Sequence, residues 1–209
     1  ANVAAVGSVT VTVNQPSAAP TALNGSPNTI CNGSSSTLTQ TGGSLGTGAS
    51  WKWYSDAGFT SLIGTSGVAN ASLSVSPTIT TTYYLRAESS TGTPCTANVA
   101  AVGSVTITVN QPSVAPTNLI RSASPICNGS SITLTQTGGS LGTGASWKWY
   151  SDAGFTTLVG TSVLANASLT LSPAATTTYY LRAESSTGAP CAANVAAVGS
   201  VTVTVNQPS

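Results

Sequence analysis

The sequence predicts an all-β protein built as two tandem β-sandwiches. Three observations support this prediction: a repeat with an offset of 96 residues, short apolar–polar alternations, and no helical period over ten residues. Alternation with period two places successive side chains on opposite faces of a strand, as a half-buried sheet requires. Six or seven such strands per repeat, separated by turn signals, are typical of an immunoglobulin-like sandwich.

Five segments of each repeat have the composition of strands. In the first repeat, the alternating segments are 37–40, 72–75 and 104–109. Segments 51–54 and 81–86 are aromatic and β-branched, and pleated surfaces favour these residue types. Breakers rich in glycine and proline separate the segments. The aligned apolar positions predict a core of Leu38, Trp51, Trp53, Leu73, Val75, Tyr83, Leu85, Val105, Ile107 and Val109.

The repeat also sets the expected domain boundaries. The sequence ANVAAVGSVTVTVNQPS occurs at residues 1–17 and 193–209, and at 97–113 with Ile107 as the one change. When residues 17–112 are set against 113–208, 77 of 96 positions agree. We therefore expect one sandwich over 17–112 and another over 113–209, with residues 1–16 forming the last strand of a preceding repeat.

Charged side chains are scarce. The 209 residues include five Lys or Arg and four Asp or Glu, for a net charge of +1. Nucleic-acid binding needs clustered Lys and Arg, and a membrane helix needs about 20 apolar residues, so neither a nucleic-acid partner nor a membrane span is expected. A near-neutral surface repels its copies weakly. The composition therefore predicts that copies of the chain associate with one another. The alternative explanation of the scarce charge is that glycans cover the surface.

Neither catalysis, nor a metal site, nor a cofactor is expected. The chain has no His, which most general-base schemes use. Each repeat has only two carboxylates, too few for a calcium site. We expect Asp56 to serve in a turn and Glu88 to pair with Lys52 across the sheet. The alternative is an isopeptide bond between Lys52 and an Asn such as Asn70 or Asn98, but Lys52 alternates with two Trp residues and so should face outward.

The aromatic residues allow a core role or a sugar-binding role. Trp51 and Trp53 are two apart and share one face, where the third strand of such a sandwich places its central anchor. A core role is therefore favoured for them over a stacking platform for sugars. The better candidates for exposure, and for contact with a glycan, are Tyr54, Tyr84, Tyr150 and Tyr180.

An ordered set of motifs resembles one known family. The set comprises Ile30-Cys31-Asn32-Gly33-Ser34, Trp51-Lys52-Trp53-Tyr54, and TTTYYLRAES followed by a VTVTV strand. It is similar to the immunoglobulin-like repeat domains of giant surface and secreted proteins of Bacteroidota, including gliding adhesins. The resemblance covers both repeats. It implies an extracellular or cell-surface location and a role as a stalk, and the alternative is a carbohydrate-binding module.

The four cysteines form two identical pairs. Their spacing lacks the CxxC-like pattern of zinc ligands, and paired cysteines indicate disulfides in an oxidising compartment. Three connectivities are possible. The favoured one joins Cys31 to Cys95 and Cys127 to Cys191. However, Cys31 and Cys95 would lie at opposite poles of a simple sandwich, so Cys31 could instead pair with Cys191 of the following repeat.

Overall fold

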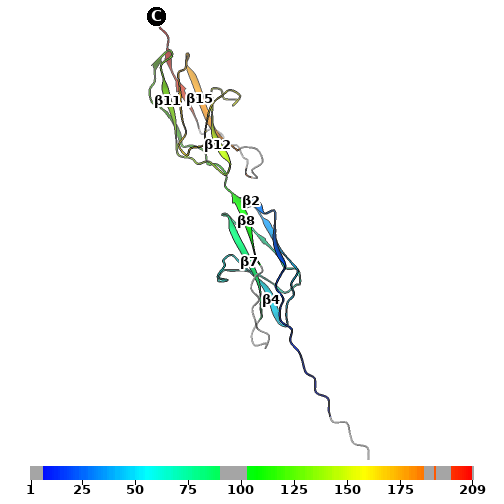
Figure 1. Cartoon of the computed structure of the whole chain (residues 1–209). Coiled ribbons are helices and arrows are strands. Elements are labelled where there is room, and N and C mark those ends of the chain that lie inside the picture. The colour runs from blue at the N-terminus through cyan, green and yellow to red at the C-terminus, as the bar shows by residue number, and fades with distance from the viewer. Residues whose placement is uncertain (1–6, 90–102, 186–190, 192–198, 209) are drawn as a thin grey trace, which may run out of the picture. The chain divides into compact units, whose positions relative to one another are not determined.

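The computed structural model describes residues 7–89, 103–185, 191 and 199–208. These residues form strands and no helix, which confirms the all-β prediction (Figure 1). The chain divides into two compact units, residues 1–28 with 35–108 and residues 29–34 with 109–209.

The strands of the first repeat form two sheets, as an immunoglobulin-like sandwich requires. One sheet has the order β1-β3-β6, and the other has the order β2-β8-β7-β4-β5. The pairs β1–β3, β3–β6, β4–β5, β4–β7 and β7–β8 are antiparallel. The bounds are β1 (Ala22–Ser26), β2 (Thr29–Cys31), β3 (Ser36–Thr41), β4 (Ala49–Tyr54), β5 (Leu62–Ser66), β6 (Ser72–Val75), β7 (Thr81–Ser89) and β8 (Ser104–Asn110).

The second repeat follows the same plan. Its sheets have the orders β14-β11-β9 and β13-β12-β15-β16, and β10 pairs with β17 in parallel. The bounds are β9 (Asn118–Arg121), β10 (Ile126–Cys127), β11 (Ile132–Thr137), β12 (Ala145–Tyr150), β13 (Leu158–Ser162), β14 (Ser168–Leu171), β15 (Thr177–Ser185), β16 (Ser200–Val203) and β17 (Val205–Asn206).

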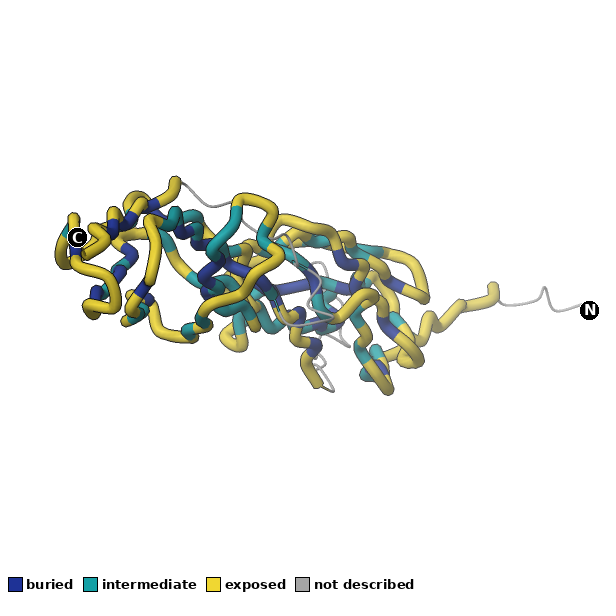
Figure 2. Tube along the Cα trace, turned by 90° about the horizontal axis from the view of Figure 1, so that it is seen from above, coloured by how far each residue is buried: buried dark blue, intermediate teal, exposed yellow. Residues whose placement is uncertain are grey.

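The core of each unit lies between its sheets and centres on two tryptophans. Trp51 and Trp53 are 0% and 1% exposed, which confirms the core role predicted for them. Buried and exposed residues alternate along the strands (Figure 2). Eight of the ten predicted core residues are buried; Leu73 and Val75 are half-buried because β6 is an edge strand.

Strands β1, β2 and β5 were not predicted, and β1 and β5 each contain a glycine. In the sequence their glycines look like breakers, yet the structure uses them for close packing. A Cβ added to Gly64 of β5 would lie 2.9 Å from Leu73 Cδ1. A Cβ added to Gly25 of β1 would lie 2.3 Å from Ile107 Cδ1. These glycines therefore mark close approaches rather than chain breaks.

The second repeat changes both members of the Gly25–Ile107 contact. By the 96-residue offset, Arg121 replaces Gly25 and Val203 replaces Ile107. Valine lacks the Cδ1 atom that approaches Gly25 in the first repeat. The one change in the ANVAAVGSVTVTVNQPS motif is thus matched by a change in the facing strand.

This contact predicts a coupling between the two positions. We expect Gly25→Ala to lower the free energy of unfolding by about 1–3 kcal/mol through overpacking, and expect that loss to at least halve in an Ile107→Val background. Urea unfolding of the unchanged chain, the two single variants and the double variant measures the coupling energy. Gly103→Ala is the control, because an added Cβ there meets nothing within 4 Å. An equal loss in both backgrounds would contradict the coupling.

Residues 7–16 carry no strand in the structure. Val9, Val11 and Val13 are 87%, 79% and 71% exposed, whereas the equivalent valines of β16 and β17 are buried. The assignment of residues 1–16 to the last strand of a preceding repeat stays a prediction.

Candidate functional site

The outer face of the β4–β7 pair carries most of the charge of the first repeat. Lys52 lies opposite Arg86 in the antiparallel register, and Glu88 lies two residues farther along β7. Lys52 Nζ is 2.6 Å from Glu88 Oε2, and Arg86 Nε is 2.5 Å from Glu88 Oε1. The Tyr54 hydroxyl donates to Oε1 at 2.5 Å. We call Lys52, Tyr54, Arg86 and Glu88 the Glu88 cluster.

An aromatic ring covers this cluster from a neighbouring turn. Phe59 lies edge-on to Tyr54 with ring centroids 5.4 Å apart, and the Arg86 guanidinium carbon lies 4.4 Å from the Phe59 centroid. The Asp56 carboxylate shapes the turn, because it accepts hydrogen bonds from the backbone N–H groups of Thr60 and Ser61. The turn role predicted for Asp56 is confirmed, and Phe59 is a site residue that the sequence analysis missed.

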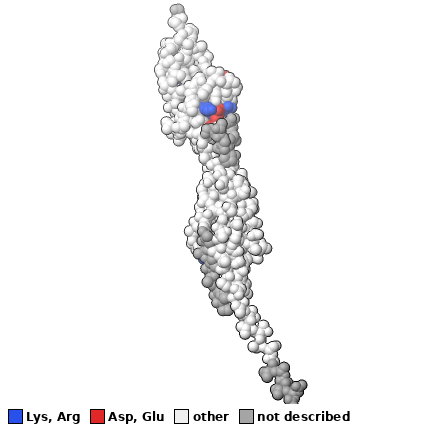
Figure 3. All heavy atoms as spheres, turned by 45° about the vertical axis from the view of Figure 1, so that its right-hand side comes forward, with Lys and Arg blue, Asp and Glu red and all other residues white. Residues whose placement is uncertain are grey.

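The second repeat reproduces the arrangement. The Glu184 cluster consists of Lys148, Tyr150, Arg182 and Glu184, with Nζ–Oε2 and Nε–Oε1 distances of 2.7 and 2.5 Å. Phe155 covers Arg182 at 4.4 Å. In the view of Figure 3, blue and red atoms meet in a small patch on the unit that lies nearer the C-terminus, and most of the other described atoms in view are white.

The two clusters contain six of the nine charged side chains in the sequence. Each contributes one Lys, one Arg and one Glu, and Asp56, Asp152 and Arg121 are the others. Within each cluster the Lys and the Arg both pair with the one Glu, which leaves a net charge of +1 on the cluster. The surface outside the clusters therefore has very little charge of either sign.

The cluster fixes the ionisation state of its members. Burial raises the pKa of Glu88, but hydrogen bonds from Lys52, Tyr54 and Arg86 outweigh burial and bring that pKa to about 2. The hydrogen bond to Glu88 raises the pKa of Lys52 above its ordinary 10.5. Burial, followed by the bond to Glu88, raises the pKa of Tyr54 above 10.0. None of these three groups exchanges protons near pH 7, as a general acid or base would need to.

The depressed pKa of Glu88 predicts a loss of stability in acid. The carboxylate titrates at about 2 when folded against an ordinary 4.5, so its contribution is complete above pH 4.5 and disappears as the pH falls toward 2. We expect a loss of about 3 kcal/mol per cluster over this range. Urea unfolding at several pH values measures it. A Glu88→Gln, Glu184→Gln variant should have a flatter pH dependence, and an unchanged slope would contradict the assignment.

The structure corrects one expectation about the tyrosines. Tyr54 and Tyr150 are each 5% exposed, so the prediction that they are exposed is wrong. Phe59 and Arg86 cover Tyr54, and the equivalent pair covers Tyr150. Tyr84 and Tyr180 are half-buried. Contact of any tyrosine with a glycan stays a prediction.

The contacts of Lys52 favour the ion pair over the isopeptide bond. The predicted partner, Glu88, is 2.6 Å from Lys52 Nζ, which confirms the cross-strand pairing. Asn70 is exposed, and Asn98 lies outside the described residues.

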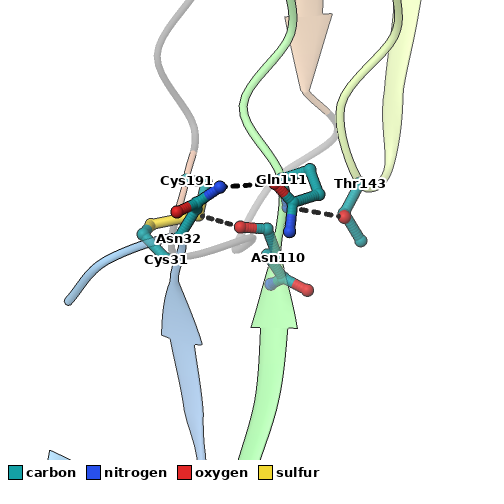
Figure 4. The surroundings of a disulfide bond; sticks show 6 residues. All are labelled: Cys31, Asn32, Asn110, Gln111, Thr143 and Cys191. Atoms are coloured by element: carbon teal, nitrogen blue, oxygen red, sulfur yellow. Dashed lines mark hydrogen bonds between the residues drawn. A yellow bond between two sulfur atoms is a disulfide. The ribbon is translucent and has the colours of Figure 1, made fainter. Parts of the chain in front are cut away.

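The disulfide differs from the favoured prediction. Cys31 is bonded to Cys191, 160 residues away, with Cα atoms 5.2 Å apart (Figure 4). The predicted Cys31–Cys95 and Cys127–Cys191 pairs are therefore wrong, and the alternative, which links one repeat to the next, is what the structure contains. Cys127 is exposed and has a free thiol, and Cys95 lies outside the described residues.

Cys31 lies at the end of β8 from which the chain continues into the second repeat, because the Asn32 N–H beside it donates to Asn110 O, the last residue of β8, at 3.0 Å. Cys31 therefore lies next to the start of the second repeat, to which Cys191 belongs.

Polar contacts surround the disulfide. Asn32 Nδ2 donates to Gln111 Oε1 at 2.8 Å, and the Gln111 N–H donates to Thr143 Oγ1 at 3.0 Å (Figure 4). Cys191 Sγ lies 3.1 Å from Asn110 O. Cys191 therefore meets both the sulfur of Cys31 and the backbone at the end of β8.

Over the described ranges, no group of three or more His, Cys, Asp or Glu side chains could hold a metal ion. In that same part of the chain, no helix has the length and apolar character needed to cross a membrane.

Comparisons with known proteins agree with the fold. A family model described as "Ig-like domain CHU_C associated" matches residues 16–111 and 113–207. A chain in the crystal structure of a mouse coronavirus receptor-binding domain complexed with its murine receptor is 16% identical with a TM-score of 0.50, covering 88% of this chain and 99% of that one. Murine CEACAM1b is 16% identical with a TM-score of 0.46, covering 89% and 98%. At 16% identity, the likeness with a TM-score of 0.50 shows the fold alone. Among curated proteins, no match was found.

Proposed function

We propose, since this chain belongs to the family of Ig-like domains associated with CHU_C, that it is a structural segment of a long extracellular adhesin or filament of the Bacteroidota type. In this role it acts as a stalk at the cell surface and associates with other copies of itself. It performs no catalysis and needs no cofactor. The proposal combines the tandem Ig-like fold, the disulfide and the distribution of charge.

The observation that carries the proposal is the confinement of charge to the two clusters. Six of the nine charged side chains lie there, with a Lys and an Arg paired to each Glu, so the rest of the surface is almost uncharged. Burying hydroxyl groups against a partner costs far less than burying unpaired charges. Copies of such a surface can therefore pack together at low cost.

The outer faces of β8 and β16 are the proposed contact surfaces. Thr106 and Thr108 are exposed on β8, and Thr202 holds the equivalent place on β16. Thr106 is hydrogen-bonded to Thr82 on the neighbouring strand, with 2.9 Å between the hydroxyl oxygens. These threonines already satisfy part of their hydrogen bonding within the sheet, which lowers the cost of covering them.

A disulfide further supports the extracellular location. Disulfides persist in oxidising compartments and are rare where thioredoxin and glutathione keep thiols reduced. The Cys31–Cys191 bond therefore favours a secreted or surface-exposed chain.

Sedimentation velocity of the full chain over a range of concentrations tests the self-association. The chain should carry Cys95→Ser and Cys127→Ser so that only non-covalent contacts are measured. We expect the mean mass to rise with concentration, and Thr106→Glu with Thr202→Glu to keep the chain monomeric. Thr106→Ser with Thr202→Ser is the matched control. A chain that stays monomeric at high concentration would overturn self-association and leave a simple spacer.

The second candidate is a carbohydrate-binding module. The observation that favours it is the partial exposure of Tyr84 and Tyr180, each beside a phenylalanine ring. Such rings can stack on sugars. Binding of the full chain to immobilised glycans, lost on Tyr84→Ala with Tyr180→Ala, would favour this candidate over a purely structural role.

A further inference from the structure

Five Asn-x-Ser triplets occur in the sequence, and the structure distinguishes between them. Such a triplet is an acceptor for N-linked glycans when its middle residue is not proline. Asn70 and Asn166 occupy the same place in the two repeats, in the β5–β6 and β13–β14 connections. We call residues 70–72 and 166–168 the loop acceptors. The other three triplets begin at Asn24, Asn32 and Asn128.

These other three triplets are less suited to receive a sugar. Asn32 Nδ2 donates to Gln111 Oε1 at 2.8 Å, and Asn128 Nδ2 donates to Gln207 Oε1 at 2.9 Å. In both cases the nitrogen that would carry the sugar is already engaged in a hydrogen bond. Asn24 lies inside β1, within the ladder that joins β1 to β3.

A buried alanine directs each loop acceptor outward. Ala71, the middle residue of the first, is 1% exposed, whereas Asn70 and Ser72 on either side of it are exposed. The second loop acceptor has the same pattern, and its Ala167 is 0% exposed. The amide and the hydroxyl that define the triplet therefore both face solvent. Within the described part of the chain, neither acceptor asparagine makes a hydrogen bond through its side-chain amide.

A buried glutamine holds each loop acceptor in this orientation. Gln40 Oε1 accepts the Ala71 N–H at 2.7 Å, and Gln40 Nε2 donates to Ala69 O at 2.9 Å. In the second repeat, Gln136 Oε1 accepts the Ala167 N–H at 2.7 Å. Gln40 and Gln136 are 4% and 1% exposed. The loop backbone is thus tied to β3 and β11, and the acceptor side chains remain available at the surface.

The loop acceptors lie at an edge of each sandwich that its own strands leave unprotected. β5 and β6 are end strands of their sheets, as are β13 and β14. Natural proteins guard such edges with charged residues, proline or a covering segment, because an open edge pairs with other chains. These four strands contain no charged residue and no proline. The edge needs protection of another kind.

Exposed apolar side chains increase that need. Leu62 and Val68 are 51% and 63% exposed in the first repeat, and Val163 and Leu164 are 75% and 65% exposed in the second. A cavity of about 560 Å³ opens beside β6, with Ile63 in its lining. A glycan is bulky and strongly hydrated, so attachment at the neighbouring connection would keep other chains away from this edge.

We propose that Asn70 and Asn166 carry N-linked glycans, which shield the edges formed by β5 with β6 and by β13 with β14. The donor is a sugar whose C1 carries a diphosphate leaving group. The asparagine Nδ2 forms a bond to C1 as the C1–O bond to the diphosphate breaks. The diphosphate leaves with the electron pair, and the amide gives one proton to a base of the transferring enzyme. Nothing is oxidised or reduced.

These glycans leave the proposed contact surfaces accessible. In the larger sheet of the first repeat, β7 and β4 lie between β8 and β5, and in the second, β15 and β12 lie between β16 and β13. The glycans therefore block one edge of each sandwich and direct association to the opposite side. This inference goes beyond the proposed function and shares with it only the extracellular location.

Mass spectrometry of tryptic peptides tests the attachment. The chain is purified from the cells that make it naturally, reduced, alkylated and digested. Cleavage after Lys and Arg leaves one loop acceptor in each of 53–86 and 149–182, and the other triplets in 1–52 and 122–148. Electron-transfer fragmentation keeps a sugar on its side chain and so locates it.

We expect sugar on Asn70 and Asn166, and none on the asparagines of the other triplets. Unmodified loop acceptors, sugar attached only to Ser or Thr, or equal occupancy of Asn32 and Asn128 would overturn the proposal.

Variants of the hydroxyl residue show whether the triplet itself is recognised. Ser72→Ala with Ser168→Ala should abolish attachment although both asparagines remain. Ser72→Thr with Ser168→Thr is the matched control and should keep it, because either hydroxyl residue completes the triplet. Sugar that persists in the alanine variant would overturn the assignment as an N-linked acceptor.

The shielding is tested by sedimentation velocity. The Thr106→Glu, Thr202→Glu chain of the sedimentation experiment is prepared in glycosylated form, with and without Asn70→Gln and Asn166→Gln. Loss of the glycans should raise the mean mass at high concentration, because the edges are then uncovered. An equal mass would overturn the shielding.

The outcome is separable from that of the proposed function. Self-association of a chain whose loop acceptors carry no sugar would overturn the glycans alone. Glycosylated loop acceptors in a chain that stays monomeric would overturn the proposed packing surfaces alone.

Discussion

Replacing Cys31 with serine is expected to lower the free energy of unfolding by about 5 kcal/mol in the oxidised protein. The bond closes a loop of 160 residues, and the chain-entropy treatment assigns roughly this stabilisation to a loop of that length. Urea unfolding followed by tryptophan fluorescence measures it, in a background with Cys95→Ser and Cys127→Ser that prevents thiol exchange.

Adding a reductant to the background chain is the control for this prediction. Reduction removes the same crosslink without changing a residue, so it should reproduce the effect of Cys31→Ser. A reductant should then have no further effect on the Cys31→Ser chain. Equal stability of the oxidised background and the Cys31→Ser variant would contradict the assigned bond.

Truncation of Trp149 to alanine is expected to cost about 3–5 kcal/mol, the range for a large aromatic side chain lost from a packed core. Trp149 is 0% exposed, and it packs with Ile132, Leu134 and Leu181 among other buried residues. Thermal or urea unfolding of the full chain measures the loss, which should appear in the transition of the second unit.

Two variants accompany this prediction. Trp149→Phe keeps an aromatic ring in the core and should cost less than Trp149→Ala. Tyr180→Ala removes a half-buried ring from the outer face and should also cost less. A loss below about 1 kcal/mol for Trp149→Ala would contradict the core role and favour a surface platform for sugars.

Period-two patterns predicted three strands of each repeat, because each pattern records one buried and one solvated face, and aromatic and β-branched composition predicted two more. The segment Ser104–Asn110, for example, alternates exposed and buried residues for most of its length. Strands β1 and β5 were missed because Gly25 and Gly64 look like breakers in a sequence. Their function, which is to admit Ile107 and Leu73, depends on a facing strand that the local sequence does not reveal.

The site was predicted only in part, for a related reason. The Lys52–Glu88 pair followed from cross-strand neighbours, a local property of the sheet. The burial of Tyr54 depends on Phe59, which a turn brings over the same face of the sheet. An aromatic residue within that turn was the one feature of the sequence that could have indicated this contact. The disulfide partner depends on which end of β8 lies beside Cys31, and cysteine spacing alone does not contain that information.

Stretching single molecules by their two ends tests the Cys31–Cys191 bond, and its fitness for the proposed stalk, most directly. In the oxidised chain, the Cys31–Cys191 bond removes residues 32–190 from the part of the chain that can be stretched. Only residues 1–31 and 191–209 can then extend, to roughly 170 Å at about 3.4 Å per residue. With reductant, or in the Cys31→Ser chain, the fully unfolded chain should extend to roughly 700 Å. Extension to roughly 700 Å without reductant would contradict the account.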